Sequence, residues 1–271
     1  MRVTQILGDK PKERVSLMPE PITFIAGNPI NTYTYFVGLG LCVACAWLIL
    51  SHRERAHAAL DVFLAGLVGA LVLGRALYVA LEWGYFAAHP DSITRLNEGG
   101  LNGHGALAGA FLAAYLMSRA RGLNIRRMMD SGALILPVMA YAGWWGCAAA
   151  RCAYGAEVAN LADYAPLLVW EQPDIYGLIA PRFATQALGA WWSVGVLALA
   201  VALTVRGWLA GRRLGLILLL FSAGMLVING LRGDAAVSTG GLSVLQWLDI
   251  PAMSFGALLF IMSPGENVKQ G

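Results

Sequence analysis

One of the four histidines of the chain lies among glycines. His104 stands in GGLNGHGALAG, residues 99–109, directly before an apolar run. The free backbone N–H groups at a helix start attract anions, and a neutral histidine there can accept a proton. Gly99, Gly100 and Gly105 keep side chains away, so a substrate can approach the backbone. A histidine that only satisfies the helix end is the alternative, and the spacing alone leaves both readings open.

Two arginines could bind a phosphate. Arg232 is flanked by glycines in NGLRGD, residues 229–234, and a planar guanidinium pairs with two phosphate oxygens at once. A salt bridge from Arg232 to Asp234 is the equal alternative. Arg75 lies in GRALY in the outer half of an apolar segment, where an arginine can also simply extend to lipid headgroups.

The remaining polar residues of the apolar segments suggest structural roles. Asp61 and Asp130 stand near expected helix starts, where an acid favours the positive end of the helix dipole, so we interpret both as caps. The four cysteines lack the spacing of a zinc site and mostly lie in apolar runs, so we interpret them as small packing residues. They are Cys42, Cys45, Cys147 and Cys152. We therefore expect neither a metal nor a cofactor.

The composition is that of an integral membrane protein. Of 271 residues, 58% are hydrophobic and 13% are charged, and the mean hydropathy is +0.62. The formal net charge of +3 gives no reason to expect a nucleic-acid partner. Seven windows could form membrane-spanning helices of about 20 residues. They fall near residues 33–51, 58–83, 103–119, 129–150, 185–205, 212–230 and 250–263.

The charges of the connecting segments predict an orientation. Arginines concentrate in SHRERAH, RARGLNIRR and RGWLAGRR, three connections that alternate with less basic ones. The positive-inside rule places them in the cytoplasm, with the N-terminus outside and the C-terminus inside, although four basic residues of the N-terminal tail oppose this. We expect one domain over residues 1–271, with an external tail of residues 1–30 and an all-α seven-helix bundle over 31–265. The segments 84–102, 151–184 and 231–249 then share the outer side.

These elements together resemble the prolipoprotein diacylglyceryl transferase family of bacterial inner-membrane enzymes. GGLNGHGALAG resembles the Gly-Gly-x-x-x-His-Gly-x-x-x-Gly element of the family, with His104 at its functional histidine. YTYFVGLG resembles the start of the family's first helix, with Tyr33 at the important tyrosine. LGRALYV, which contains Arg75, resembles the Gly-Arg-Leu-x-Tyr element of the family's second helix. Arg232 matches the family's second essential arginine.

The resemblance implies a reaction. Family members transfer the diacylglyceryl group of phosphatidylglycerol to the lipobox cysteine thiol near the signal peptide of a prolipoprotein, and glycerol phosphate leaves. On this basis His104, Tyr33 and Arg232 are the expected catalytic residues. The expected substrate-binding residues are Arg75, Arg151, Gly99, Gly100, Gly105, Gly146 and Gly155. The protein is then expected in the bacterial inner membrane, as a multi-pass enzyme without a cofactor.

The sequence departs from the family at the end of the fourth span. Trp144 stands where the family has an essential arginine, and Gly189 stands where it has the glutamate of Gln-x-Tyr-Glu. Arg151 follows Trp144 by about two helical turns, so on a continuous helix its side chain could return positive charge to the vacated site. A position at the headgroup level is the alternative for Arg151. A non-catalytic relative that only binds a phospholipid or a lipoprotein is therefore the rival function, and a small transporter is a third with little support.

Overall fold

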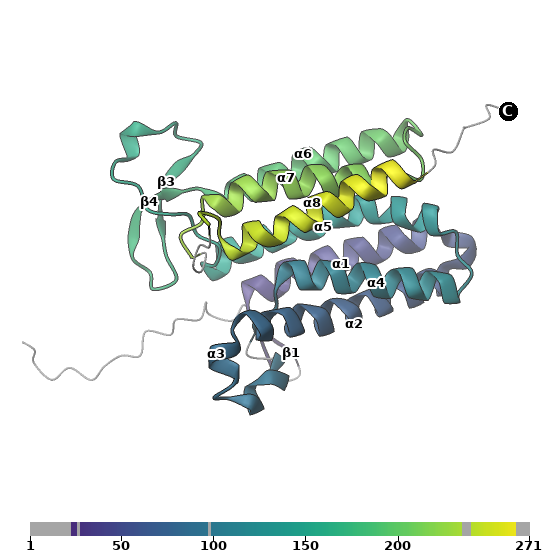
Figure 1. Ribbon diagram of the computed structural model, residues 1–271, viewed down its shortest axis with the longest axis horizontal. Coiled ribbons are helices and arrows are strands. Elements are labelled where there is room, and N and C mark those ends of the chain that lie inside the picture. The colour runs from purple at the N-terminus through teal and green to yellow at the C-terminus, as the bar shows by residue number, and fades with distance from the viewer. Residues whose placement is uncertain (1–22, 26–27, 97–98, 235–239, 264–271) are drawn as a thin grey trace, which may run out of the picture.

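The chain folds into a bundle of long, roughly antiparallel helices (Figure 1). The computed structural model describes residues 23–25, 28–96, 99–234 and 240–263. The expected N-terminal tail and the C-terminal end therefore lie almost entirely outside the described residues. Seven long helices occur in the described ranges: α1 (Thr32–Ser51), α2 (Ala56–Leu81), α4 (Gly103–Ala120), α5 (Ile125–Ala150), α6 (Thr185–Val205), α7 (Arg213–Gly230) and α8 (Val244–Met262).

The long helices confirm the expected membrane class. Among the described residues, six helices are long and apolar enough to cross a membrane, namely α1, α2, α5, α6, α7 and α8. The helix α4 is not among them, because its three glycines, His104 and Arg119 lower its mean hydropathy. A helical protein with several candidate spans is thus confirmed, and the count of seven spans stays a prediction.

Two helices begin earlier than hydropathy predicts. The helix α5 starts at Ile125 rather than residue 129, because the Asn124 side chain accepts a hydrogen bond from the N–H of Arg127. The helix α8 starts at Val244 rather than residue 250, where Ser243 and Gln246 form a reciprocal capping box. Polar caps and first turns carry no apolar signal, so the windows missed them.

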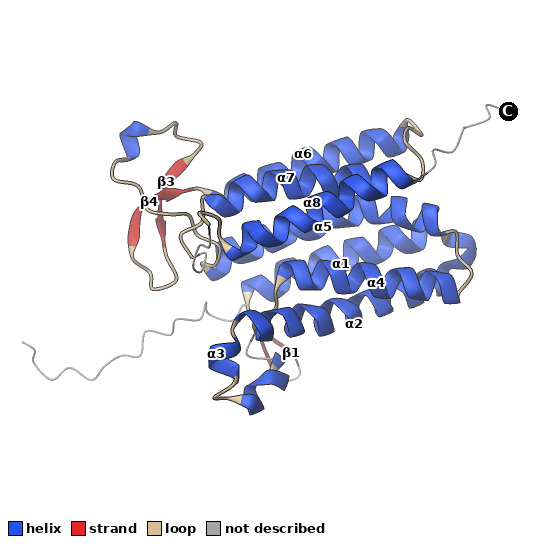
Figure 2. Ribbon diagram, viewed as in Figure 1, coloured by secondary structure: helices blue, strands red, loops and turns tan. Residues whose placement is uncertain are grey.

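Two short antiparallel hairpins accompany the helices and were not expected (Figure 2). Strand β1 (Thr23–Ile25) pairs with β2 (Asn28–Ile30), and β3 (Val169–Pro173) pairs with β4 (Ile179–Phe183). The turn between β3 and β4 is fixed by Asp174, whose carboxylate accepts hydrogen bonds from the N–H groups of Tyr176 and Leu178. The expectation of an all-α chain is therefore corrected before α1 and in the connection between α5 and α6, while the bundle itself is helical.

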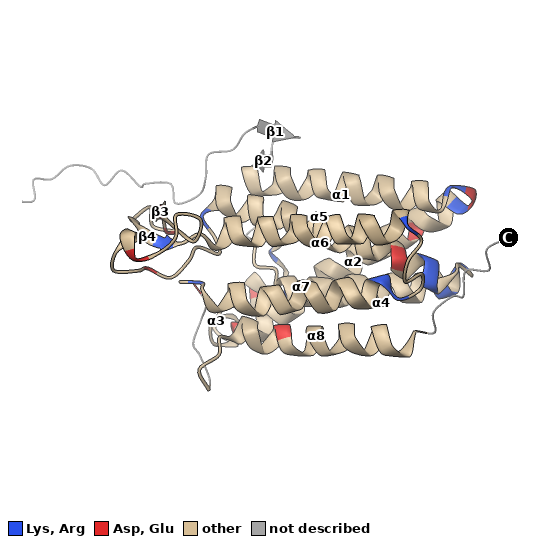
Figure 3. Cartoon of the chain, turned by 90° about the horizontal axis from the view of Figure 1, so that it is seen from above, with Lys and Arg blue, Asp and Glu red and all other residues tan. Residues whose placement is uncertain are grey.

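The two ends of the bundle differ. The β3–β4 hairpin, the short helix α3 (Trp83–Phe86) and the start of α8 lie at one end, which we call the loop end (Figure 1). The three arginine-rich connections join α1 to α2, α4 to α5 and α6 to α7, so they lie at the opposite end, the basic end (Figure 3). The described parts of the three long segments thus lie at one end of the bundle, and their placement outside the membrane stays a prediction.

Glycines allow helix pairs to pack closely. The backbones of Gly69 in α2 and Gly109 in α4 are in contact, and a Cβ atom on either glycine would overlap the other's carbonyl group. Gly215 in α7 and Gly256 in α8 approach in the same way. The hydrophobic effect does not hold helices together in lipid, so their association depends on van der Waals packing, and small residues allow the close approach that this packing needs. These contacts fix how α4 and α8 are held within the bundle.

The two acids expected as caps do not cap their own helices. Asp61 and Asp130 lie in the second turns of α2 and α5. Asp61 forms an ion pair with Arg121 at 2.8 Å. Asp130 accepts hydrogen bonds from the N–H groups of Gly211 and Arg213, so it stabilises the start of α7 instead. Sequence proximity suggested a local role, whereas the partners come from neighbouring connections.

Candidate functional site

His104 is held at the start of α4 by a cap and by an acid from a distant helix. The Asn102 side chain accepts hydrogen bonds from the N–H groups of His104 and Gly105, which starts the helix. His104 Nε2 lies 2.8 Å from Oδ1 of Asp249 in α8. Asp249 is buried, with 2% of its side chain exposed, whereas His104 keeps 22%. The imidazole of His104 therefore contacts a buried acid on one side and remains partly exposed itself.

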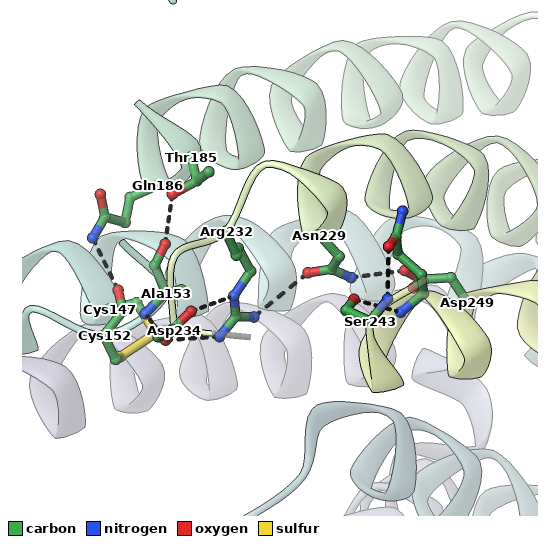
Figure 4. Close-up of polar contacts among 11 residues, drawn as sticks. Cys147, Cys152, Ala153, Thr185, Gln186, Asn229, Arg232, Asp234, Ser243 and Asp249 are labelled. Atoms are coloured by element: carbon green, nitrogen blue, oxygen red, sulfur yellow. Dashed lines mark hydrogen bonds and ion pairs between the residues drawn. A yellow bond between two sulfur atoms is a disulfide. The ribbon is translucent and has the colours of Figure 1, made fainter. Parts of the chain in front are cut away.

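The contact extends from Asp249 to Arg232 (Figure 4). The second oxygen of Asp249 accepts a hydrogen bond of 2.7 Å from Nδ2 of Asn229 in α7. Oδ1 of Asn229 in turn lies 3.5 Å from Nη1 of Arg232, just after the end of α7. Two predicted catalytic residues thus belong to one series of contacts, His104–Asp249–Asn229–Arg232, which we call the polar chain.

Arg232 also forms a two-point ion pair with Asp234. Its Nε and Nη2 atoms donate to the two carboxylate oxygens at 2.8 and 3.0 Å. The N–H of Ala153 donates to the same carboxylate at 2.8 Å. The salt bridge that the sequence left as an alternative is therefore present. A phosphate-binding role for Arg232 stays a prediction, and it would use Nη1 or displace Asp234.

The segment after α5 packs beside Arg232 and carries a disulfide. Cys147 and Cys152 form a disulfide bond, so the expectation of free thiols is wrong for these two residues. The turn at the end of α5 brings the two cysteines together, a proximity that hydropathy does not reveal. The hydroxyl of Thr185 donates to the carbonyl of Ala153, and Gln186 donates to the carbonyl of Cys152 (Figure 4). The disulfide and these bonds fix the backbone that supports Asp234.

Arg75 is buried and folds the connection between α2 and α4. Its guanidinium donates to backbone carbonyls, among them those of Ser92, Ile93, Gly99 and Gly100. It therefore does not extend to headgroups, as one alternative had it. Substrate binding by Arg75 stays a prediction, and its observed partners belong to the protein.

The remaining predicted residues lie at the same end of the bundle. The ring of Tyr33, at the start of α1, covers Gly146 of α5, where a Cβ atom would overlap it. Gly105 faces Leu73 and Leu77 of α2. Gly155 faces the backbone of Phe183 and forms a bridge with Arg232. The structure gives each of these glycines a packing reason, and their binding of substrate stays a prediction.

The comparison with known proteins decides the family. A family model described as prolipoprotein diacylglyceryl transferase matches residues 21–262. The chain belongs to this family. A relative from Clostridium novyi (strain NT), a phosphatidylglycerol–prolipoprotein diacylglyceryl transferase by name, is 31% identical over 257 residues, covering 92% of this chain and 96% of the relative. A relative of the same name from Bacillus licheniformis is 30% identical over 250 residues, covering 88% and 90%.

The departure from the diacylglyceryl transferase pattern at Trp144 is accompanied by a second departure at Gly189, against which Trp144 packs. Trp144 is buried, and its indole lies directly on Gly189 of α6, where any Cβ atom would overlap the ring. The two positions at which the resemblance implies an arginine and a glutamate therefore face each other. An aromatic ring on a glycine fills this space instead.

Arg151 does not return its charge to the position of Trp144. The helix α5 ends at Ala150, and Arg151 adopts the left-handed conformation with φ of 57°. Its Nη1 atom lies beside Gly177 in the turn between β3 and β4. The helix continues past Gly146 as the proposal required, but the turn at Arg151 directs the side chain toward the hairpin. The relocated-arginine interpretation is corrected on this ground.

Asp249 and Asn229, the two central residues of the polar chain, were not singled out from the sequence. Asp249 is the only charged residue of the run QWLDIPAM, and it directly precedes the apolar window predicted over residues 250–263. An acid inside a membrane helix is costly and marks a functional or paired position, so this signal was present. Its partners, 145 and 20 residues away, could not be identified from one sequence. Within the described ranges, no group of three His, Cys, Asp or Glu residues could hold a metal.

Proposed function

We propose that this protein is a phosphatidylglycerol–prolipoprotein diacylglyceryl transferase. It moves the diacylglyceryl group of an anionic phospholipid to the lipobox cysteine of a prolipoprotein. The family membership and the names of its relatives support this reaction. The observation that carries the proposal is the polar chain, because it joins a proton acceptor at His104 to a phosphate-binding group at Arg232.

The geometry supports a division of labour between the ends of the polar chain. His104 takes the thiol proton, and the thiolate attacks the glycerol carbon that carries the phosphate ester. A carbon–sulfur bond forms as the carbon–oxygen bond breaks, and the bonding electron pair leaves with the phosphate oxygen. Arg232 stabilises the negative charge that develops on the departing glycerol phosphate. Because Asp234 already occupies the Nε and Nη2 edge of the guanidinium, Nη1 of Arg232 is the group that first meets the phosphate.

The same proposal includes a membrane arrangement. The loop end lies outside the bacterial inner membrane, and the basic end lies in the cytoplasm, as the positive-inside rule favours. The Cys147–Cys152 disulfide supports this orientation, because disulfides persist on the oxidising side of a membrane. The helix α4 is the seventh span, since it packs along α2 over its length. Phosphatidylglycerol and the signal-peptide region of a prolipoprotein then meet at the loop end.

One observation favours the rival function. Trp144 replaces an arginine that the resemblance marks as essential, and its buried indole cannot bind a phosphate through paired N–H groups. A relative that binds phosphatidylglycerol or a lipoprotein without transferring anything would tolerate this change. The two functions therefore differ only in whether the bound lipid reacts.

Complementation separates the two functions. A bacterial strain depleted of its own transferase is supplied with the wild-type gene or with His104→Gln, and expression and membrane insertion are verified for both. We expect growth and mature lipoproteins with the wild type and neither with His104→Gln. A well-inserted wild-type protein that supports no growth would favour the binding relative.

A further inference from the structure

The position of Asp249 requires a reason. It lies in the second turn of α8 with 2% of its side chain exposed, in a helix that is apolar enough to span a membrane. An acid at such a depth costs several kcal/mol unless it is paired. Both of its oxygens are used, one by His104 and one by Asn229. The carboxylate is thus held by two side chains from two other helices.

We infer that Asp249 is the positioning residue of the transfer reaction, which fixes the orientation and the tautomer of His104 so that Nδ1 faces the substrate thiol. This inference rests on the proposed function for the identity of the thiol. The inference requires no direct contact between Asp249 and the phospholipid or the thiol. Asp249 acts only through the imidazole.

Hydrogen-bond chemistry determines the tautomer. An ionised carboxylate only accepts hydrogen bonds, so Nε2 of His104 must carry the proton in its 2.8 Å contact with Asp249. Nδ1 then holds a lone pair, and no residue in the described part of the chain forms a hydrogen bond with it. The side chain is 22% exposed, and the inference places Nδ1 on this exposed part. When Nδ1 takes the thiol proton, the carboxylate stabilises the resulting imidazolium.

Asn229 fixes the orientation of the Asp249 carboxylate by binding one of its two oxygens. Its Nδ2 donates to Oδ2 of Asp249 at 2.7 Å, which leaves Oδ1 for His104. Its Oδ1 faces Arg232, so one amide sets the positions of both the proton acceptor and the phosphate-binding group. The rival explanation is a structural tie between α4 and α8, which also meet where the rings of Phe111 and Phe255 pack edge to face.

The experiment combines kinetics with a direct reading of the tautomer. Purified protein in phosphatidylglycerol vesicles is assayed with a lipobox peptide, and histidine-labelled protein is examined by ¹⁵N NMR, with His104→Gln used to assign the His104 signals. We expect Nε2–H and bare Nδ1 in the wild type. For Asp249→Asn we expect a mixed tautomer and a fall in kcat on the order of 10²-fold or more, with KM changed by less than about threefold.

Asp130→Asn is the matched control, since it removes another largely buried helix acid at the basic end. It should keep the kcat of correctly folded protein even if it lowers the melting temperature. An Nδ1–H tautomer in the wild type would overturn the inference, as would an equal loss of kcat in both variants or an unchanged kcat in Asp249→Asn. The wild-type tautomer decides the matter if Asp249→Asn does not fold. A wild type without transferase activity would contradict the proposed function alone, because the tautomer is read without turnover.

Discussion

At the scale of single residues, Trp144 and Gly189 together replace the arginine and the glutamate that the family resemblance implies at these two positions. The indole occupies the space above a glycine that could not carry a Cβ atom. The resemblance implies an arginine and a glutamate at these positions, and a buried ion pair can be replaced by well-packed apolar groups of similar volume without loss of stability. The two substitutions therefore make sense only together, which explains how the chain keeps its fold without the arginine.

This exchange predicts strong coupling in a double-mutant cycle. Trp144→Arg alone buries an unpaired charge and should lower the free energy of unfolding by about 3–5 kcal/mol. Gly189→Glu alone overpacks the ring and should cost at least about 1–3 kcal/mol. The double variant should be at least about 1 kcal/mol more stable than the sum of the two costs predicts. Melting in detergent measures all three, and simple additivity would show that the two positions do not substitute for an ion pair.

His52 predicts a pH dependence at the basic end. Burial, and then the nearby charge of Arg127, lower the pKa of His52 below its ordinary value of 6.5. Its ring contacts the hydroxyl of Ser131 at 3.1 Å. The folded state therefore binds this proton less readily than the unfolded state, so the stability is present above about pH 6.5 and is lost as the pH falls through the lowered pKa.

The measurement is the melting temperature between about pH 7.5 and about pH 5. The wild type should lose stability over this range, and His52→Asn should lose markedly less. His57→Asn, at an exposed position in the first turn of α2, should behave as the wild type. An identical pH dependence in wild type and His52→Asn would exclude His52 as its source.

At the scale of helices and strands, a close backbone contact joins α2 to α4, the helix that carries His104. Gly69 and Gly109 touch through their backbones, so Gly109→Val forces the helices apart. We expect about 1–3 kcal/mol lower free energy of unfolding and a loss of transferase activity, because α4 carries His104 to Asp249. Gly195→Val in α6 is the control, since open space surrounds that glycine and its stability should change little. Equal effects of the two variants would contradict this packing account.

The sequence predicts elements better than it predicts contacts between them. The cores of the seven long helices follow from apolar runs, because burial in lipid requires continuous hydrophobic residues. The β3–β4 hairpin was missed because its strands have five residues each and depend on the Asp174 turn. His104 and Arg232 were predicted as site residues because glycines flank both of them in the sequence. Asp249 was missed because an acid's meaning depends on partners from α4 and α7 that only the fold brings together.

In the whole molecule, the two ends of the bundle have opposite chemistry. The loop end carries the polar chain and the disulfide, and the basic end carries the three arginine-rich connections (Figure 3). The orientation is tested with single cysteines in a Cys42→Ser, Cys45→Ser background. Leu178 and Trp208 are similarly exposed, at 62% and 57%, in the hairpin turn and in the α6–α7 connection.

An impermeant maleimide applied to intact spheroplasts should label Leu178→Cys and should label Trp208→Cys only after permeabilisation. The physical reason is the positive-inside rule, which retains the arginine-rich connections in the cytoplasm. Labelling with the reverse pattern would invert the proposed topology and would place the polar chain on the cytoplasmic side.

The central claim is that the polar chain supports transfer and not only binding. The most direct measurement follows a lipobox peptide incubated with purified wild-type protein in phosphatidylglycerol vesicles, by mass spectrometry of the peptide and by assay of released glycerol phosphate. We predict a diacylglyceryl thioether on the cysteine, with one glycerol phosphate released per modified peptide, and neither product with His104→Gln. An unmodified peptide in the presence of folded, phosphatidylglycerol-bound wild-type protein would contradict the claim and identify the chain as a binding relative.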